Sequence, residues 1–319
     1  MAAEAIEAIT VEAGEAQRLA VRRVSLAPPE PGEVSVRVNA ISLNRGEVKR
    51  ALTVTPSGTI PGWDFAGVVE ETVDAPGALP VGARVVGMVA NGSWSQVVRA
   101  PSSALAVIPE GVSDAVAASL PVAGLTALHA LRKGGLLLGR KVLVDGCTGG
   151  VGHFAIQLAA ASGARVYSHV RREDQRSIVQ ASSSGGVIVG ATLEAARSAG
   201  PFDLIVDSVG GSALSAALTM LRRNGACVTV GASEGELVSF DSAAFFRASG
   251  ASLFSLILGD DIAATEPASD GLALLLHLVS AGMLTPSIAI EAPWTDISAV
   301  ARQLIDRAFT GKAVLHLPR

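Results

Sequence analysis

Cysteine, aromatic residues and charge are all scarce in this chain of 319 residues, and each shortage excludes a class of protein. Two cysteines cannot build a disulfide scaffold or a Cys-rich zinc module. Charged residues make up only 17%, far too few for a disordered chain. The 29 acidic and 25 basic side chains give a net charge of −4, so the chain lacks the positive charge that is typical of nucleic-acid-binding proteins.

Long apolar runs are also missing, although hydrophobic residues make up 49% of the sequence and can form a large core. The apolar stretch at residues 272–276 ends at His277, well short of the roughly 18 residues that a membrane span needs. The first residues are acidic and lack the basic region and apolar run of a secretory signal. We therefore expect a soluble cytoplasmic protein, and the length favours two domains.

The pattern of apolar residues changes near Pro121. Before it, short β-branched runs such as residues 34–38 and 84–89 alternate with Pro and Gly turn signals, which is typical of irregular, mostly antiparallel β structure. After it, apolar strands alternate with helix-length segments, which predicts βαβ crossovers and a doubly wound parallel sheet. These strands are expected at residues 141–144, 164–170, 204–206 and 226–230.

The C-terminal part of the chain is mixed. Amphipathic helices are predicted over residues 270–283 and 297–309, followed by a strand at residues 313–315. The order of the whole chain is therefore a β-rich part, an α/β part and a short mixed tail.

A glycine-rich loop follows the strand at residues 141–144 and precedes a helix predicted over residues 153–161. Its first glycine permits a tight turn out of the strand, the pair of glycines in its middle lets the backbone approach a pyrophosphate closely, and the last glycine lets helix and strand pack closely. The spacing G-x-x-G-G-x-G differs from the strict G-x-G-x-x-G, and a plain glycine turn is the alternative. Its place between strand and helix favours a dinucleotide site. The loop consists of Gly146, Cys147, Thr148, Gly149, Gly150, Val151 and Gly152.

The residues at the end of the next strand distinguish NADP from NAD. An acidic side chain there would bind the 2′-hydroxyl of NAD, but Arg171 and Arg172 follow the strand instead. Guanidinium groups form bidentate pairs with phosphate, and the hydroxyl of Ser168 can add a further bond. The sequence therefore predicts NADPH. The alternative is that the arginines are ordinary surface charges and that Glu173 or Asp174 binds the ribose.

Several segments along the chain carry a family resemblance: residues 41–47 (ISLNRGE), 60–69 (IPGWDFAGVV), 120–127 (LPVAGLTA), 149–159 (GGVGHFAIQLA), 207–211 (DSVGG) and 311–315 (GKAVL). In these segments the chain resembles zinc-independent medium-chain dehydrogenases/reductases of the NADPH:quinone oxidoreductase-like branch. The resemblance implies a split, GroES-like, β-rich catalytic domain over residues 1–121 and 265–319. It also implies a Rossmann cofactor-binding domain over residues 122–264, a cleft for the nicotinamide and, usually, a homodimer.

The resemblance also implies which residues line the cofactor: Asn44, Thr126, the loop from Gly149 to Gly152, Val209, Gly210 and Gly231. Zinc-dependent relatives carry Cys and His-Glu where this chain has Asn44 and Trp63-Asp64, and they carry a four-Cys lobe that this chain lacks. Two cysteines and five scattered histidines do not supply the expected tetrahedral site, so we predict no metal. The histidines are read as surface or packing residues.

Chemistry without a metal favours one type of reaction. Alcohol oxidation needs a group that polarises the oxygen, whereas hydride addition to an electron-poor C=C bond needs only donors for the developing negative charge. We therefore predict an NADPH-dependent reductase of activated alkenes or quinones. Candidate catalytic residues are Asn44 and Arg45, with Thr126 near the nicotinamide. Glu47 is a candidate acid, unless it simply pairs with Arg45.

Two other functions stay open on the sequence alone: a zinc-free carbonyl reductase, and a non-catalytic NADPH-binding regulatory protein. The apolar segment at residues 251–258 is the expected edge strand of a homodimer, or else an ordinary buried strand.

Overall fold

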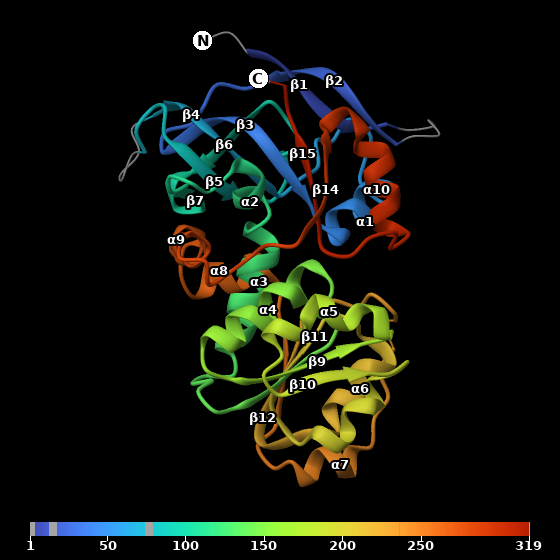
Figure 1. Cartoon of the computed structure of the whole chain (residues 1–319). Coiled ribbons are helices and arrows are strands. Elements are labelled where there is room, and N and C mark those ends of the chain that lie inside the picture. The colour runs from blue at the N-terminus through green and yellow to red at the C-terminus, as the bar shows by residue number, and fades with distance from the viewer. Residues whose placement is uncertain (1–3, 13–17, 74–78, 236, 319) are drawn as a thin grey trace. The chain divides into compact units, whose positions relative to one another are not determined.

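The computed structural model describes residues 4–12, 18–73, 79–235 and 237–318 of the chain. The chain divides into two compact units. One comprises Met1–Leu125, Thr265–Gly282 and Pro286–Arg319, and the other Thr126–Ala264 and Met283–Thr285. Helix α3 (Pro121–Arg132) runs across the boundary at Leu125 (Figure 1).

The first unit is built on a seven-stranded sheet with the order β14-β15-β3-β4-β5-β7, in which β6 also pairs with β3. Most neighbours are antiparallel, and β1 and β2 form a separate antiparallel pair. The strands are β1 (Glu4–Val11), β2 (Leu19–Leu26), β3 (Glu33–Leu43), β4 (Asp64–Thr72), β5 (Arg84–Met88), β6 (Val97–Pro101), β7 (Leu105–Val107), β14 (Ile288–Pro293) and β15 (Lys312–His316). Both ends of the chain thus contribute to one sheet.

Short helices complete the first unit: α1 (Arg45–Thr53), α2 (Asp114–Ala118), α9 (Ala268–Ser280) and α10 (Ile297–Ile305). The predicted alternation at residues 34–38 is confirmed in part: Val34, Val36 and Val38 are buried in the core of this unit and Arg37 is exposed, but Ser35 is buried as well. The core also holds Trp94, which is fully buried.

The second unit contains a six-stranded, wholly parallel sheet with the order β10-β9-β8-β11-β12-β13 (Figure 1). Its elements are β8 (Lys141–Val144), α4 (Gly150–Ala161), β9 (Arg165–Val170), α5 (Arg176–Val179), β10 (Gly186–Val189), β11 (Phe202–Asp207), α6 (Gly211–Leu218), β12 (Leu221–Thr229), α7 (Ser242–Arg247), β13 (Ser252–Ser255) and α8 (Leu258–Ala264). The predicted doubly wound parallel sheet is confirmed. Its direction of winding reverses between β8 and β11, which is where such sheets bind ligands.

Several element boundaries differ from the expected ones. Helix α4 begins at Gly150, inside the glycine-rich loop, rather than at residue 153. The helix expected to reach residue 309 ends at Ile305, because Arg307 has a positive φ of 57° that a helix cannot continue through. The apolar run at residues 251–258 forms a strand only as far as Ser255. Among the described residues, no helix combines the length and apolar character needed to cross a bilayer.

A cluster of buried charged residues connects α1, β4 and β15 of the first unit with the end of β3. Glu47 of α1, Asp64 of β4 and Lys312 of β15 are 3%, 0% and 3% exposed. Lys312 Nζ donates to Asn44 Oδ1 at 2.6 Å and to the Leu43 carbonyl at 3.1 Å, and it lies 3.4 Å from Asp64 Oδ2. One ammonium thus faces two carboxylates in a setting with little water. We therefore expect one of the two carboxylates to hold a proton.

Burial raises the pKa of both carboxyls, and their contacts assign the proton to Glu47, because Asp64 accepts hydrogen bonds from Asn44, Lys312 and the backbone N–H of Val122. Burial, and then the neighbouring carboxylate of Asp64, raise the pKa of Glu47 to about 8. Its Oε1 accepts from the backbone N–H of Asn44 at 2.7 Å, while Oε2 is buried and has no hydrogen-bond partner within the described chain. A neutral carboxyl at this place leaves the cluster with one negative and one positive charge.

The raised pKa predicts how stability depends on pH. A carboxyl whose pKa is higher in the folded state favours folding most when it is protonated in both states, so the free energy of unfolding falls as pH rises from about 4.5 towards about 8. Glu47→Gln stays neutral at every pH and removes the part of this fall that Glu47 causes, while the raised pKa of Asp64 still contributes a fall of the same sign. Thermal unfolding between about pH 5 and about pH 8 should show the variant gaining stability on the wild type as pH rises.

Glu110→Gln, at an exposed glutamate of the same unit, is the matched control and should follow the wild type. Unfolding midpoints of Glu47→Gln that run parallel to the wild type across this range would show that Glu47 is ionised in the folded protein.

Candidate functional site

The glycine-rich loop leaves β8 through a tight turn and becomes the start of α4. Gly146 has φ +70°, and a Cβ there would lie 2.2 Å from Ser208 Oγ. A Cβ on Gly152 would lie 2.3 Å from the Gly146 carbonyl oxygen and 2.6 Å from Cys147 Cα. At Gly152 the clashing atoms belong to the backbone and cannot move out of the way, and at Gly146 the positive φ disfavours any side chain, so both positions require glycine.

The first turn of α4 offers what an anion needs. Gly149 is the N-cap and Gly150 the first helical residue, so the N–H groups of Gly150, Val151 and Gly152 have no acceptor within the helix. The helix dipole adds a positive partial charge at the same place. Gly149 is exposed, and Thr148 and Gly150 are half-buried. This loop, residues 146–152, therefore fits the phosphates of a dinucleotide and is named the phosphate loop.

A second turn lies beside the loop, at the end of β11. Asp207 accepts hydrogen bonds from the backbone N–H groups of Val209 at 3.1 Å and Gly210 at 3.1 Å, and from Thr229 Oγ1 at 3.2 Å. Gly210 has φ +76°, and a Cβ there would lie 2.8 Å from the carbonyl oxygen of Gly235. The turn thus brings two of the predicted cofactor residues to the same edge of the sheet as the phosphate loop.

Ser208 ties the two turns together. Its Oγ donates to the carbonyl of Asp145 at 3.2 Å, one residue before the phosphate loop. Gly231, also predicted to line the cofactor, follows β12, and a Cβ there would lie 3.2 Å from the Ser208 carbonyl oxygen. These contacts gather the ends of β8, β11 and β12 at the switch point of the sheet.

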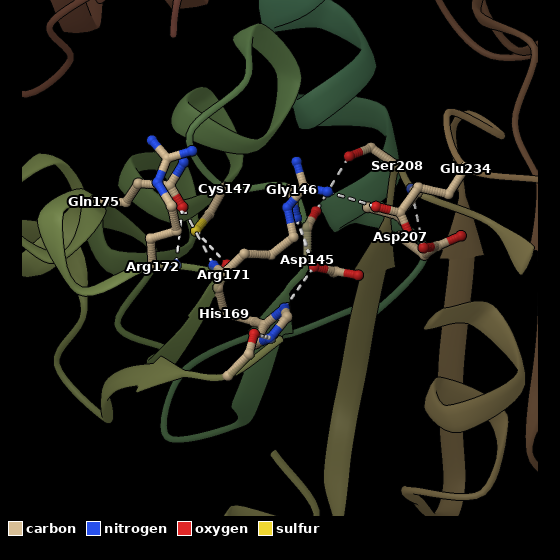
Figure 2. A network of polar contacts seen from close by, with 12 residues as sticks. Asp145, Gly146, Cys147, His169, Arg171, Arg172, Gln175, Asp207, Ser208 and Glu234 are labelled. Atoms are coloured by element: carbon tan, nitrogen blue, oxygen red, sulfur yellow. Dashed lines mark hydrogen bonds and ion pairs between the residues drawn. The ribbon is translucent and has the colours of Figure 1, made fainter. Parts of the chain in front are cut away.

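Arg171 follows β9 and pairs with Glu234, which follows β12. The guanidinium Nη1 lies 2.7 Å from Glu234 Oε1 (Figure 2), and both side chains are partly exposed, at 50% and 36%. Strands β8 and β11 lie between β9 and β12 in the sheet. The ion pair therefore spans the carboxyl ends of β8 and β11, where the phosphate loop and the turn at Asp207 lie.

Arg172 and its acidic neighbours are paired locally. Arg172 Nε and Nη2 contact the two carboxylate oxygens of Asp174 at 3.0 and 3.2 Å, and both side chains are 67% exposed. Glu173 pairs with Arg176 one turn further on. Gln175 Oε1 accepts from the backbone N–H groups of Arg171 and Arg172 at 3.2 and 3.3 Å and so fixes the path of the chain after β9. Both acidic side chains proposed as ribose ligands thus have arginine partners.

Ser168 lies in the interior. It is fully buried, and its Oγ accepts from Ser183 Oγ at 2.7 Å. This contact corrects the expectation of a hydroxyl bond to a 2′-phosphate, because the hydroxyl supports the packing beneath β9. The difference arises because successive side chains of a strand point to opposite faces, and Ser168 points to the face away from that of His169.

The candidate catalytic residues have separate surroundings. The side-chain amide of Asn44 donates to Asp64 Oδ2 at 2.8 Å and its oxygen accepts from Lys312. Arg45 does not pair with Glu47, since its Nη1 donates to the carbonyls of Leu304 and Ile305 at 2.9 and 2.8 Å, at the end of α10. A guanidinium held at a helix C-terminus acts as a cap.

Thr126, the third candidate, lies on α3 and is 6% exposed. The two cysteines are also buried, and burial is the main cause that raises the pKa of Cys147 to about 12 and raises that of Cys227 as well. Thiols that stay protonated are poor nucleophiles. In the described part of the chain, no three His, Cys, Asp or Glu side chains gather as metal ligands would.

Three residues at this edge were not singled out from the sequence. Glu234 pairs with Arg171, and His169 pairs with Asp145 at 2.8 Å. Asp145 follows β8 and His169 lies in β9, next to the paired residues Val144 and Ser168. That register is the signal that would have placed the carboxylate beside the imidazole, once β8 and β9 are taken as parallel neighbours.

Comparison with known families gives two matches. Residues 150–273 match the family described as zinc-binding dehydrogenase, and residues 30–110 match the alcohol dehydrogenase GroES-like domain. Among curated proteins, the mycocerosic acid synthase-like polyketide synthase of Mycobacterium tuberculosis is 30% identical over 324 residues, which cover 96% of this chain. The chain spans only 15% of the length of that relative.

Solved structures share the whole fold. A mycobacterial quinone oxidoreductase is 26% identical with a TM-score of 0.81, covering 98% of this chain and 99% of that one. The CurK enoyl reductase is 21% identical with a TM-score of 0.82, over 98% and 99% of the two chains, a likeness that shows the fold. Together with the phosphate loop and the doubly wound sheet, these matches show that the chain belongs to the medium-chain dehydrogenase/reductase family of oxidoreductases, whose members bind a nicotinamide cofactor.

Proposed function

We propose that this chain is an NADPH-dependent reductase that acts on activated alkenes or quinones without a metal ion. The observation that carries the proposal is the guanidinium of Arg171, held across the carboxyl ends of β8 and β11 beside the phosphate loop. A cation there suits a ligand with a phosphate on its adenosine ribose.

The residues present fit such a cofactor. The first turn of α4 would hold the pyrophosphate, and Val209, Gly210 and Gly231 would let the dinucleotide approach the backbone closely. Arg171 and Arg172 would hold the 2′-phosphate, each exchanging a carboxylate partner for it. Asp174 and Glu173 are engaged by arginines, which disfavours either as the ribose ligand of NAD.

The first unit supports the absence of a metal from the reaction. At Asn44 and Asp64, where zinc-dependent relatives carry ligands, the side chains bond to each other and to the ammonium of Lys312. A fixed cation already neutralises these oxygens, so a second cation would be repelled. Asn44 and Thr126 stay the candidate residues for the reaction. Arg45 would contribute only by capping α10.

The substrate class rests on chemistry and on relatives. When bound, reduced nicotinamide supplies a hydride, which an electron-poor C=C bond or a quinone accepts with one proton from solvent or a side chain. The names of the similar proteins include a quinone oxidoreductase, an enoyl reductase and a polyketide synthase. Enones, enoyl thioesters and quinones are therefore the substrates to test.

A turnover screen tests the function. The purified chain, with its metal content measured, is mixed with NADPH or NADH and a panel of quinones, enones, enoyl thioesters and simple aldehydes, and absorbance at 340 nm is followed. We expect oxidation of NADPH with at least one electron-poor alkene or quinone and none with simple aldehydes, at substoichiometric metal. Turnover of aldehydes alone would indicate a carbonyl reductase, and NADPH binding without turnover a regulatory protein.

Variants of the Arg171–Glu234 pair test the choice of NADPH. A hydrogen bond to a charged group contributes about 1.5–3 kcal/mol, so Arg171→Ala together with Arg172→Ala should weaken NADPH binding roughly tenfold or more and leave NADH unchanged. Glu234→Gln removes the competing carboxylate and should tighten NADPH binding by a few-fold. Dissociation constants from calorimetry give the comparison.

Arg223→Ala, at an exposed arginine on β12, is the matched control and should bind both nucleotides like the wild type. Equal losses of NADPH and NADH affinity in the double arginine variant would rule out the assignment.

We also propose that the second unit pairs with another copy of the chain. Strand β13 is the edge of its sheet, and Leu253 and Phe254 on it are 47% and 37% exposed rather than buried. An unpaired apolar edge favours pairing with another strand.

Leu253→Glu should shift a dimer to monomers in sedimentation velocity, because it places a charge in the proposed interface. Leu136→Glu is the control: it introduces the same charge at a leucine outside this strand that is 79% exposed, and it should leave the dimer intact. A wild-type monomer at micromolar concentration would rule out this interface.

A further inference from the structure

The proposed function leaves one buried ion pair of the second unit without a role. Asp145 and His169 are each 4% exposed, at the ends of the neighbouring parallel strands β8 and β9 (Figure 2). His169 Nδ1 lies 2.8 Å from Asp145 Oδ1, and His169 Nε2 lies 3.0 Å from the carbonyl oxygen of Gly190. Buried ionisable pairs are costly to maintain, so this pair calls for an explanation.

The partners of His169 define its charge. A carboxylate and a backbone carbonyl only accept hydrogen bonds, whereas a neutral imidazole carries a single N–H. Only the imidazolium, with two N–H groups, satisfies both acceptors. Burial by itself would lower the pKa of His169, but the hydrogen bond and charge of Asp145 and the carbonyls of Gly190 and Thr192 together raise it above its ordinary value.

The pair is also bonded to the phosphate loop. Asp145 Oδ1 accepts from the backbone N–H of Gly146 at 2.8 Å, and Cys147 Sγ donates to the backbone carbonyl of His169 at 2.9 Å (Figure 2). The first two residues of the loop are therefore fixed to β9 through both the side chain and the backbone of His169. A shift of His169 would move the loop.

Two carboxylates lie close to the phosphate loop and would repel a bound phosphate. Asp145 places a carboxylate one residue before a loop suited to bind phosphates, and Asp207 at the end of β11 places a second one nearby. The carbonyls of Gly190 and Thr192 lie close to the imidazole, and the protonated thiol of Cys147 contacts the backbone carbonyl of His169. The imidazolium is thus the cation that compensates Asp145 directly.

We propose that His169 is a positioning residue for the cofactor, whose imidazolium neutralises Asp145 and holds the phosphate loop in the form that accepts a pyrophosphate. The inference rests on the proposed nicotinamide dinucleotide, but not on its 2′-phosphate. Loss of the proton from His169 leaves one acceptor unsatisfied and exposes the loop to an uncompensated carboxylate. Affinity for both NADPH and NADH should therefore fall as His169 titrates.

The experiment measures dissociation constants of NADPH and NADH by calorimetry from about pH 6 to about pH 9. Wild-type affinity should fall as pH rises through the range above the ordinary histidine value. His169→Asn has no imidazolium to compensate Asp145 at any pH. At the low end of this range it should therefore bind both nucleotides about tenfold more weakly than the wild type, and its affinity should not depend on pH. Asp145→Asn with His169→Asn should recover most of the affinity. His277→Asn, at an exposed histidine on α9, is the control and should match the wild type.

A second readout needs no variant. The imidazole signals of His169 in the nucleotide-free protein should titrate above about 6.5 by NMR. A lower value, an affinity without pH dependence, or equal losses in His169→Asn and the double variant would overturn the proposal, because a purely structural contact gives the last result. A pH-dependent affinity for both nucleotides without preference for NADPH would overturn the proposed NADPH specificity and support this inference. If neither nucleotide binds, both fail.

Discussion

The second unit depends on a steric constraint at the end of β8. The backbone of the phosphate loop folds back on itself so closely that a Cβ on Gly152 would meet the Gly146 carbonyl oxygen at 2.3 Å. This close approach of the backbone, which glycine allows, lets α4 begin inside the loop, with its free N–H groups at the switch point of the sheet. Everything proposed about the cofactor follows from this geometry, since both arginines and the turn at Asp207 are arranged around the same edge.

Charge at this edge is balanced through pairs. Arg171, which follows β9, pairs with Glu234, which follows the distant strand β12. His169 neutralises Asp145, the carboxylate directly before the loop. The exposed pair is weak and can open for a phosphate, whereas the buried pair is expensive to break. One part of the site can therefore exchange partners while the other keeps its form. In the first unit, the cluster of Glu47, Asp64 and Lys312 uses the same balance to hold Asn44 in place.

The sequence was sufficient for the architecture and for the place of the glycine-rich loop between β8 and α4. Alternating strands and helices, and glycines at positions that tolerate no side chain, depend on local spacing, which a sequence displays. The sequence was insufficient for contacts made across the sheet. The pairing of Arg171 with Glu234 depends on strand order, and that of Arg45 with the end of α10 depends on packing between distant segments. Ser168 was misplaced because a strand covered on both faces shows no alternation to reveal which way each side chain points.

A crystal structure of the protein with NADPH is the decisive measurement for the proposed cofactor site. We expect the pyrophosphate at the N–H groups of Gly150–Gly152, Asp145 and His169 still paired beneath it, and the 2′-phosphate bound by Arg171, whose contact with Glu234 is broken. A dinucleotide bound away from this loop, or a 2′-phosphate facing solvent with the Arg171–Glu234 pair intact, would contradict it.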